Sequence, residues 1–529
     1  MPRKDNASPR QIKPMLAEVQ RQDEALLGCR GSEVTQQLPR RLSHGVLRWA
    51  ETHPKQLAII GTAGSLTYGE LASAVDECRL WLAGQNILPG DRVMLIAENG
   101  PGLMAMFLAL SELDAVAVVI NARLSDREID LIQADCDPKL LLCTVDDSAD
   151  AKAHGVRLGA RPCDFSVASF SYLNCAAEPD QVSDDPADLT LAMIYTTGTT
   201  GSPKGVMLTH QNLMFIAYVS GKLRGIERGD EIYCVLPMSH VFGLSAVSSS
   251  VLFAGGCVHL IPRFDAKEVV RVIADEPIKG FLGVPTMYAL MLEAMPETWQ
   301  PRSLKFMYSG GSPLDPALKR KIESRFGLPL HNGYGLTETG PTICQTRQYA
   351  PMENTSVGFS LPGEEVRILD DDGEPVAPGQ VGELWVKGPN VMKGYYRKPE
   401  LTAEVKIDGW FNTGDLVFQD DTGAINIAGR SKELIIRSGF NVYPPEVEAV
   451  LTDFPGVSLC AVLGEEVAGD EEIVAYLQPE AGIELDQEAL QQHAREYLTG
   501  YKVPTRWVVM AELPTAPSGK ILKHQLKGR

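Results

Sequence analysis

Short apolar runs alternate with segments of helical pattern along most of the chain, and this alternation restricts the fold more than any other feature. Residues 93–96 and 116–120 are two such runs, and residues 101–113 between them have the pattern of a helix. Strands that are joined by helices usually run parallel in one sheet, and the helices cover both of its faces. We therefore expect an α/β fold with mostly parallel sheets.

The alternation changes at two places, which divide the chain. Residues 364–388 contain short alternating strands between glycine-rich turns, which is typical of a small antiparallel or barrel-like subdomain. A new segment of strand–helix–strand pattern begins after Arg430, and a chain of 529 residues is too long for one core. We expect a poorly defined tail over 1–40, a large domain over 41–431 and a small α+β domain over 432–529.

Charge and cysteine content exclude several classes of protein. The formal net charge is −19, whereas a surface that binds nucleic acid needs a basic patch. The ten cysteines form no C-x-x-C pair, so neither a zinc site nor a disulfide framework is expected. The chain does not open with the apolar run of a signal peptide, and polar residues interrupt the most hydrophobic stretch, 103–120. We expect a cytoplasmic protein with no integral membrane segment and no nucleic acid partner.

The segment from Tyr195 to Gly205 has the composition of a phosphate-binding loop. It follows the apolar run 189–194 and contains glycines, hydroxyl side chains and one lysine. Backbone N–H groups in such a loop can bind phosphate oxygens, and Lys204 adds a full positive charge. The Walker sequence does not fit, because Pro203 precedes Lys204 and a glycine follows it. A flexible surface loop without function is the alternative.

This loop resembles the signature loop of the adenylate-forming (AMP-binding) superfamily, in its acyl- and aryl-CoA synthetase branch. Four later segments resemble the other motifs of that family and follow in the same order: 309–314, 332–339, 410–415 and 514–521. The resemblance implies an enzyme that uses ATP and Mg²⁺ and forms an acyl-adenylate. It also implies that the C-terminal domain is a mobile lid.

The resemblance places a nucleotide site on these motifs. It implies that Tyr334 stacks on the adenine, that Asn332 pairs with the adenine amino group, and that Asp415 accepts hydrogen bonds from the ribose hydroxyls. Ser312 stands where the family more often has alanine. The ATP-binding residues that it implies are Thr196, Thr197, Gly198, Thr199, Thr200, Gly201, Lys204, Gly310, Gly311, Ser312, Asn332, Gly333, Tyr334, Gly335, Thr337, Asp415 and Arg430.

The same resemblance implies four catalytic residues. Lys520 would neutralise the charge that builds on the phosphoryl oxygens when the carboxylate attacks the α-phosphorus. Thr337 would donate to the α-phosphate, and Glu338 would be the Mg²⁺ ligand, since a carboxylate is the oxygen ligand that this ion prefers. His240 would gate the carboxylate site; a buried core histidine is the alternative.

The acceptor in the second half-reaction is implied to be coenzyme A. Lys432 matches the hinge of the family, and the CoA tunnel is placed at Ser438, Gly439 and Phe440. Loading of a separate carrier protein stays open as the alternative acceptor. A luciferase-like oxygenase and a nucleotide-sensing binding protein are the other classes considered, and neither has an independent sign in the sequence. A homodimer is also left open.

The acyl pocket follows from the same resemblance. Its implied residues carry no Arg, Lys or Asp, which disfavours a second carboxylate or an α-amino group on the acid. We expect a monocarboxylic acid with an apolar tail, either aliphatic or aryl, and hence a place in fatty acid or aromatic acid metabolism. The pocket residues are His240, Phe242, Ala246, Gly310, Gly335, Pro341 and Thr342, with Gly333 beside them.

Overall fold

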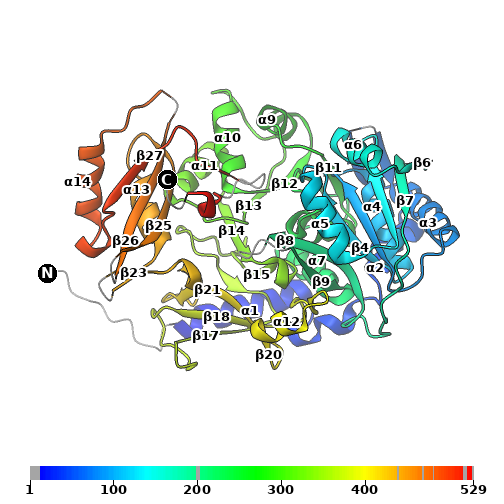
Figure 1. The fold of residues 1–529 in the computed structure, drawn as a ribbon, viewed down its shortest axis with the longest axis horizontal. Coiled ribbons are helices and arrows are strands. Elements are labelled where there is room, and N and C mark those ends of the chain that lie inside the picture. The colour runs from blue at the N-terminus through cyan, green and yellow to red at the C-terminus, as the bar shows by residue number, and fades with distance from the viewer. Residues whose placement is uncertain are drawn as a thin grey trace.

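The computed structural model describes residues 12–62, 64–197, 203–437, 440–467, 470–480, 482–515 and 521–526. Two large mixed sheets, a smaller antiparallel sheet and a C-terminal α+β unit make up the molecule (Figure 1). This architecture confirms the expected α/β fold. Within the described ranges, no helix is both long and apolar enough to cross a membrane.

The first large sheet has the strand order β19-β9-β8-β4-β3-β5-β7-β6. Its central strands β3, β4 and β5 run parallel and are buried almost throughout, which is why their sequences are continuous apolar runs. The strands are β3 (Arg92–Ala97), β4 (Val116–Asn121), β5 (Leu140–Thr144), β6 (Arg161–Asp164), β7 (Ser169–Asn174), β8 (Thr190–Thr197), β9 (Pro203–Thr209) and β19 (Gly394–Tyr395).

The second large sheet has the order β16-β15-β14-β13-β12-β10-β11-β1-β2. The six central strands β14, β13, β12, β10, β11 and β1 run parallel. Strand β2 joins antiparallel at one end of the sheet, and β15 and β16 join antiparallel at the other. The strands are β1 (Leu57–Gly61), β2 (Gly64–Thr67), β10 (Glu231–Cys234), β11 (Cys257–Leu260), β12 (Ile278–Gly283), β13 (Phe306–Ser309), β14 (Leu330–Gly335), β15 (Thr342–Gln345) and β16 (Phe359–Ser360).

Helices cover both large sheets. The helix expected over 101–113 is α4, and it is buried along its length because it contacts β1 of one sheet and β4 of the other. The helices of this part are α2 (Leu42–Thr52), α3 (Tyr68–Gly84), α4 (Pro101–Glu112), α5 (Asp126–Cys136), α6 (Ala149–Arg157), α7 (His210–Leu223), α8 (Ser250–Ala254), α9 (Ala266–Asp275), α10 (Pro285–Ala294), α11 (Pro316–Phe326) and α12 (Pro399–Val405).

The third sheet is antiparallel, which is one of the two forms expected for residues 364–388. Its order is β17-β18-β21-β20, and β22 pairs with the other edge of β21. The expected segment supplies β17 and β18. The strands are β17 (Glu365–Leu369), β18 (Gly382–Lys387), β20 (Lys406–Ile407), β21 (Trp410–Gln419) and β22 (Ile425–Arg430).

The C-terminal unit is built on a sheet with apolar residues on both faces. Ile473 and Ala475 belong to one buried cluster and Val474 and Tyr476 to another, as expected when alternate residues of a strand face opposite sides. Its elements are β23 (Ile435–Arg437), β24 (Phe440–Val442), α13 (Pro444–Thr452), β25 (Val457–Val467), β26 (Asp470–Pro479), α14 (Gln487–Tyr497) and β27 (Arg506–Val509).

The N-terminal segment differs from the expected poorly defined tail. Residues 12–27 form helix α1 (Ile12–Leu27), which lies beneath the sheet that contains β15 (Figure 1). Asp23 of α1 and Arg347 are both almost fully buried, and the guanidinium binds the carboxylate through contacts of 2.9 and 2.8 Å. The Tyr349 hydroxyl donates to the same carboxylate at 2.6 Å. These long-range contacts anchor a segment whose own composition does not predict order.

Candidate active site

The two ends of the signature loop are held by the β8–β9 hairpin. Thr196 pairs with Lys204 and Tyr195 with Gly205 across the hairpin, and residues 198–202 between them lie outside the described part of the chain. A side chain at position 205 would lie 2.7 Å from the sulfur of Met193 and 3.0 Å from the Tyr195 ring, so these two side chains would have to shift to admit it. Of the implied phosphate ligands, Gly198, Thr199, Thr200 and Gly201 therefore have no described position, and neither does the side chain of Thr197.

Lys204 and Glu338 meet at a tyrosine that the sequence did not single out. The Lys204 ammonium lies 5.5 Å from the centroid of the Tyr395 ring, and the Tyr395 hydroxyl donates to Glu338 Oε1 at 2.8 Å. Burial, together with the nearby Glu338, raises the pKa of Tyr395, so its hydroxyl keeps the proton that it donates. The contact brings a phosphate-binding cation and a carboxylate from distant segments to one point.

Glu338 is suited to bind a Mg²⁺ ion that is also held by the phosphates of a nucleotide. Among the described residues, no group of three or more His, Cys, Asp or Glu side chains could hold a metal ion alone. A single carboxylate fits Mg²⁺, which is usually held by one or two carboxylates, water and substrate phosphates. Thr337 is buried beside it at the start of the short helix Thr337–Thr339.

Asp415 lies at a point where two protein donors already hold it. Arg430 Nε binds Oδ1 at 2.9 Å, and the Tyr334 hydroxyl donates to Oδ2. Burial and the adjacent carboxylate raise the pKa of Tyr334, which keeps this hydroxyl protonated. Asp415 and Arg430 face each other across β21 and β22, so the ladder itself positions the pair.

The strand ends β13 and β14 bring the glycine-rich motifs together. Ser309 pairs with Asn332, so 310–312 leave β13 beside 333–335, which continue in β14 and pair with β15. Asn332 is held by two hydrogen bonds, because its Nδ2 donates to the Thr355 carbonyl and its Oδ1 accepts from the Gly333 amide. An amide oxygen can accept two hydrogen bonds, so Oδ1 keeps one acceptor site for a donor such as an adenine amino group.

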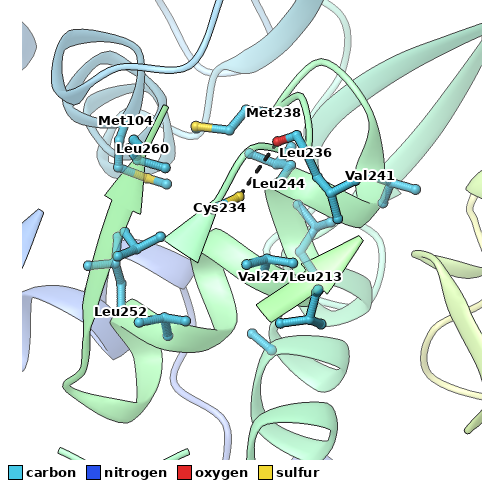
Figure 2. Packing of buried hydrophobic residues seen from close by; sticks show 14 of the residues in the cluster. Met104, Leu213, Cys234, Leu236, Met238, Val241, Leu244, Val247, Leu252 and Leu260 are labelled. Carbon is cyan, nitrogen blue, oxygen red and sulfur yellow. Dashed lines mark hydrogen bonds between the residues drawn. The ribbon is translucent and has the colours of Figure 1, made fainter. Parts of the chain in front are cut away.

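The segment that carries His240 is fixed by apolar anchors on either side. Leu236, Met238, Val241, Leu244 and Val247 point into a cluster with Cys234 and Leu213, as Figure 2 shows. Residue 243 must be glycine, since a side chain there would lie 2.4 Å from two carbonyl oxygens. The anchors leave the intervening His240 exposed and Phe242 partly exposed.

His240 is held in a defined tautomer. The Phe242 amide donates to His240 Nδ1 at 3.2 Å, so a neutral ring carries its proton on Nε2. The residue is exposed to solvent, yet many protein atoms surround its ring, and this desolvation lowers the pKa of His240. The residue is therefore a neutral hydrogen-bond donor at neutral pH.

The structure brings together part of the implied acyl pocket. Phe242 lies 3.2 Å from the point where a side chain on Gly310 would begin, and the Gly333 carbonyl is 3.3 Å from that point. Ala246 is fully buried in a cluster with residues of α7. The Pro341 carbonyl fills the space beside Gly335, so that glycine makes room for backbone. Thr342 begins strand β15 and is buried.

The segment implied to meet CoA lies against residues 501–503. Phe440 stacks on Tyr501 with ring centroids 4.6 Å apart, and Arg437 donates to the carbonyls of Tyr501 and Val503. Phe440 is half exposed. Ser438 and Gly439 lie outside the described residues.

The hinge position lies next to the ribose motif. Lys432 is in the short helix Ser431–Glu433, and the Ser431 hydroxyl donates to the Gly414 carbonyl at 3.1 Å. Lys520 falls within 516–520, which the structure does not describe. Thr515 and Ile521 on either side of that gap form an antiparallel bridge.

Family models and curated relatives match this chain over most of its length. The family model for the AMP-binding enzyme matches residues 46–396, and that for its C-terminal domain matches 446–520. A feruloyl-CoA synthase of Amycolatopsis sp. is 35% identical, with 91% of this chain and 98% of the relative covered. An indoleacetate–CoA ligase of Aromatoleum aromaticum is 33% identical over 92% and 97%.

Solved structures give the same result. ATP-bound MatB from Rhodopseudomonas palustris has a TM-score of 0.80 at 29% identity, covering 91% of this chain and 98% of that one. O-succinylbenzoate coenzyme A synthetase (MenE) from Bacillus subtilis, in complex with ATP and magnesium ion, has a TM-score of 0.77 at 30% identity, covering 91% and 99%.

Proposed function

Because the chain belongs to the AMP-binding enzyme family, we propose that it is an AMP-forming acid–CoA ligase that uses ATP, Mg²⁺ and coenzyme A. In the first half-reaction a carboxylate oxygen attacks the α-phosphorus of ATP, and pyrophosphate leaves. In the second, the CoA sulfur attacks the acyl carbonyl carbon and AMP leaves, while the thiol proton passes to solvent. The products are acyl-CoA and AMP.

One arrangement carries this proposal. Asp415 is bonded to Tyr334, and four residues further along the chain Glu338 is bonded to Tyr395, over which the Lys204 ammonium lies. Asp415 would thus bind the ribose, Glu338 the metal ion and Lys204 the phosphates. These three residues follow one another in the order in which a nucleotide carries those groups. Lys204 and residues 196–201 would hold the β- and γ-phosphates, and Asp415 and Arg430 the ribose.

The remaining roles belong to the same proposal. His240 would orient the substrate carboxylate through Nε2, and Lys520 would neutralise charge at the α-phosphoryl group. A lid that begins at Lys432 would exchange Lys520 for the surface at Ser438, Gly439 and Phe440 before the thiol attacks. Apolar clusters that end at residue 427 and begin again at 435 support a boundary between 431 and 432.

The acid is proposed to be a monocarboxylic acid with an apolar aliphatic or aryl tail. Phe242 and the glycines at 310 and 333 would leave a narrow space suited to a flat group. The similarity to relatives named for feruloyl and indoleacetate groups favours the aryl alternative. All ten cysteines are free thiols, which supports a reducing, cytoplasmic location.

A product assay tests the proposal. Purified protein is incubated with ATP, Mg²⁺ and CoA and with fatty, cinnamic, benzoic and short-chain acids, and products are identified by mass spectrometry. Acyl-CoA and AMP in equal amounts are expected. AMP and pyrophosphate without thioester would show that the acceptor is another thiol, such as that of a carrier protein.

A matched pair of variants controls the assay. Lys204→Met is expected to lower pyrophosphate release by roughly 10²-fold or more, since a charged phosphate contact is lost. Lys222→Met removes another lysine that lies near a tyrosine ring but is solvent-exposed, and it is expected to retain activity. Equal activity in both variants would overturn the assignment of Lys204.

A further inference from the structure

A buried arginine without a carboxylate partner lies behind the proposed acyl pocket. Arg224 follows α7 and is 3% exposed. Its Nη1 donates to the Ala246 carbonyl, and its guanidinium lies 5.1 Å from the centroid of the Tyr308 ring. In the described part of the chain no Asp or Glu pairs with it, its Nε has no acceptor, and burial lowers its pKa to about 10. Burying a cation without a paired anion costs free energy that hydrogen bonds to neutral groups only partly offset.

The second nitrogen without an acceptor belongs to Gln345. Its Oε1 accepts from Arg224 Nη2 at 3.2 Å, and its Nε2 is buried without a hydrogen-bond acceptor. A guanidinium can only donate, so the amide oxygen must face it and the amide N–H₂ must face away. The orientation of this amide is therefore set by Arg224. Both atoms that lack partners are donors, so this part of the core is short of an acceptor.

Gln345 extends to the same face of the β14–β15 ladder as Gly333, which the sequence placed beside the implied acyl pocket. It is directly opposite Gly333 in the β14–β15 ladder, and its Cβ is 3.9 Å from where a Cβ on Gly333 would stand. Residues directly opposite each other in an antiparallel pair extend to the same face. Because Gly333 has no side chain, no side chain from this position of β14 stands between Gln345 and the backbone at Gly333, whose carbonyl lies 3.3 Å from the Cβ position of Gly310.

We propose that Gln345, oriented by Arg224, is a specificity-determining residue at the far end of the acyl pocket. It would donate through Nε2 to an oxygen at the end of the substrate tail remote from the activated carboxylate. The ligand class is thus a monocarboxylic acid whose otherwise apolar tail ends in a neutral hydrogen-bond acceptor oxygen, such as that of a hydroxyl group. Arg224 acts as a positioning residue. This inference rests on the proposed ligase activity.

The test compares acids that differ only at the tail end. With the skeleton that is turned over in the product assay, for example cinnamic or octanoic acid, kcat/KM is measured for tail-methyl, tail-hydroxyl and tail-carboxylate forms. The wild type is expected to prefer the tail-hydroxyl form over the methyl form by roughly 10–100-fold, the range of a buried hydrogen bond. A preference for the tail-carboxylate form over both others would contradict a neutral tail oxygen and overturn the ligand class.

Two variants of Gln345 separate recognition from folding. Gln345→Leu is expected to reduce the preference to about one while turnover of the methyl form stays within a few-fold. Gln345→Glu places a carboxylate against Arg224, which keeps the core charge-balanced and removes the donor, but a tail hydroxyl can still donate to that carboxylate. This variant is therefore expected to keep part of the preference. An unchanged preference in Gln345→Leu, or a wild type that prefers the methyl form, would overturn the inference.

Variants of Arg224 and of the neighbouring Gln348 test the positioning role of Arg224. Arg224→Met is expected to lower the preference mainly through a higher KM for the oxygen-bearing acid, and Arg224→Lys to restore part of it. Gln348 donates to the Arg224 carbonyl at 2.7 Å and lies on the same segment, so Gln348→Leu is the matched control and should keep the preference. Failure to form any acyl-CoA would instead count against the proposed function itself.

Discussion

Asp23→Ala is expected to release helix α1 from the large domain. The substitution removes the carboxylate that Arg347 binds through contacts of 2.9 and 2.8 Å, with both residues at most 2% exposed. The Arg347 guanidinium would keep three backbone carbonyls, those of Gln345, Phe359 and Ser360, but no counter-charge from α1. Those carbonyls cannot balance its charge.

The size of the effect follows from the burial of the pair. Removing one partner of a buried ion pair costs about 3–5 kcal/mol, and the Tyr349 hydroxyl would lose its acceptor at a further cost of about 1 kcal/mol. The cost cannot exceed the free energy of docking α1, because undocking gives Arg347 access to water. We therefore expect local opening of α1 rather than global unfolding.

Hydrogen exchange measures this opening. A cost of about 3–5 kcal/mol corresponds to an opening equilibrium that is roughly 10²–10⁴-fold more favourable, and amides of residues 15–27 should lose protection by that factor. Glu18→Ala is the matched control on the same helix, since its pair with Arg21 is exposed and is expected to contribute at most about 0.5 kcal/mol.

A double variant tests whether charge is the cause. Asp23→Ala combined with Arg347→Met removes both charges, and replacing a buried pair by apolar residues is often neutral. Most of the lost protection should then return. If Asp23→Ala behaves like Glu18→Ala, or if the double variant is no better than the single one, the buried pair does not hold α1.

Four further predictions concern catalysis and pH. Lys520→Ala should lower adenylation by roughly 10²–10³-fold yet spare thioester formation from supplied acyl-AMP, and equal loss in both steps would contradict its role. Gly439→Leu should block CoA transfer while pyrophosphate release continues, and undiminished thioester formation would place the CoA tunnel elsewhere. Asp415→Asn should raise the KM for ATP by roughly 10–100-fold, measured by pyrophosphate release, because a charged acceptor is lost; an unchanged KM would contradict ribose binding. Burial lowers the pKa of His210 to about 3, so the unfolded chain binds more protons below its ordinary value of 6.5 and stability falls as pH drops through this range. Thermal unfolding between pH 7 and 5 should therefore lose less stability in His210→Gln than in the wild type, and parallel curves would refute the assignment.

Local sequence patterns predicted the elements well. The apolar run 116–120 is β4 and the helix pattern 101–113 is α4, because the spacing of apolar residues reflects burial directly. The antiparallel character of 364–388 also followed from its turns. Such patterns depend only on neighbours in the chain, and there the sequence is sufficient.

Contacts between distant segments could not be predicted in this way. The order of the N-terminal segment depends on Arg347, which is 324 residues from Asp23. The bond that occupies Asn332 ends on Thr355, and the partner of Glu338 is Tyr395, 57 residues away. A glycine followed by two tyrosines at 394–396 was a visible sign of a special site, but nothing local connected it to Glu338.

The buried side chains that follow residue 434 pack with one another, in clusters that draw on residues 435–526 alone. A domain with its own hydrophobic core can change its orientation relative to a neighbouring domain without exposing that core. Reorientation therefore disturbs only the interface between the two domains. For the same reason, substitutions within this interior and within the large domain can accumulate independently over evolution. Among relatives, substitutions in one part should then depend on substitutions in the other only at the surface where the two parts touch.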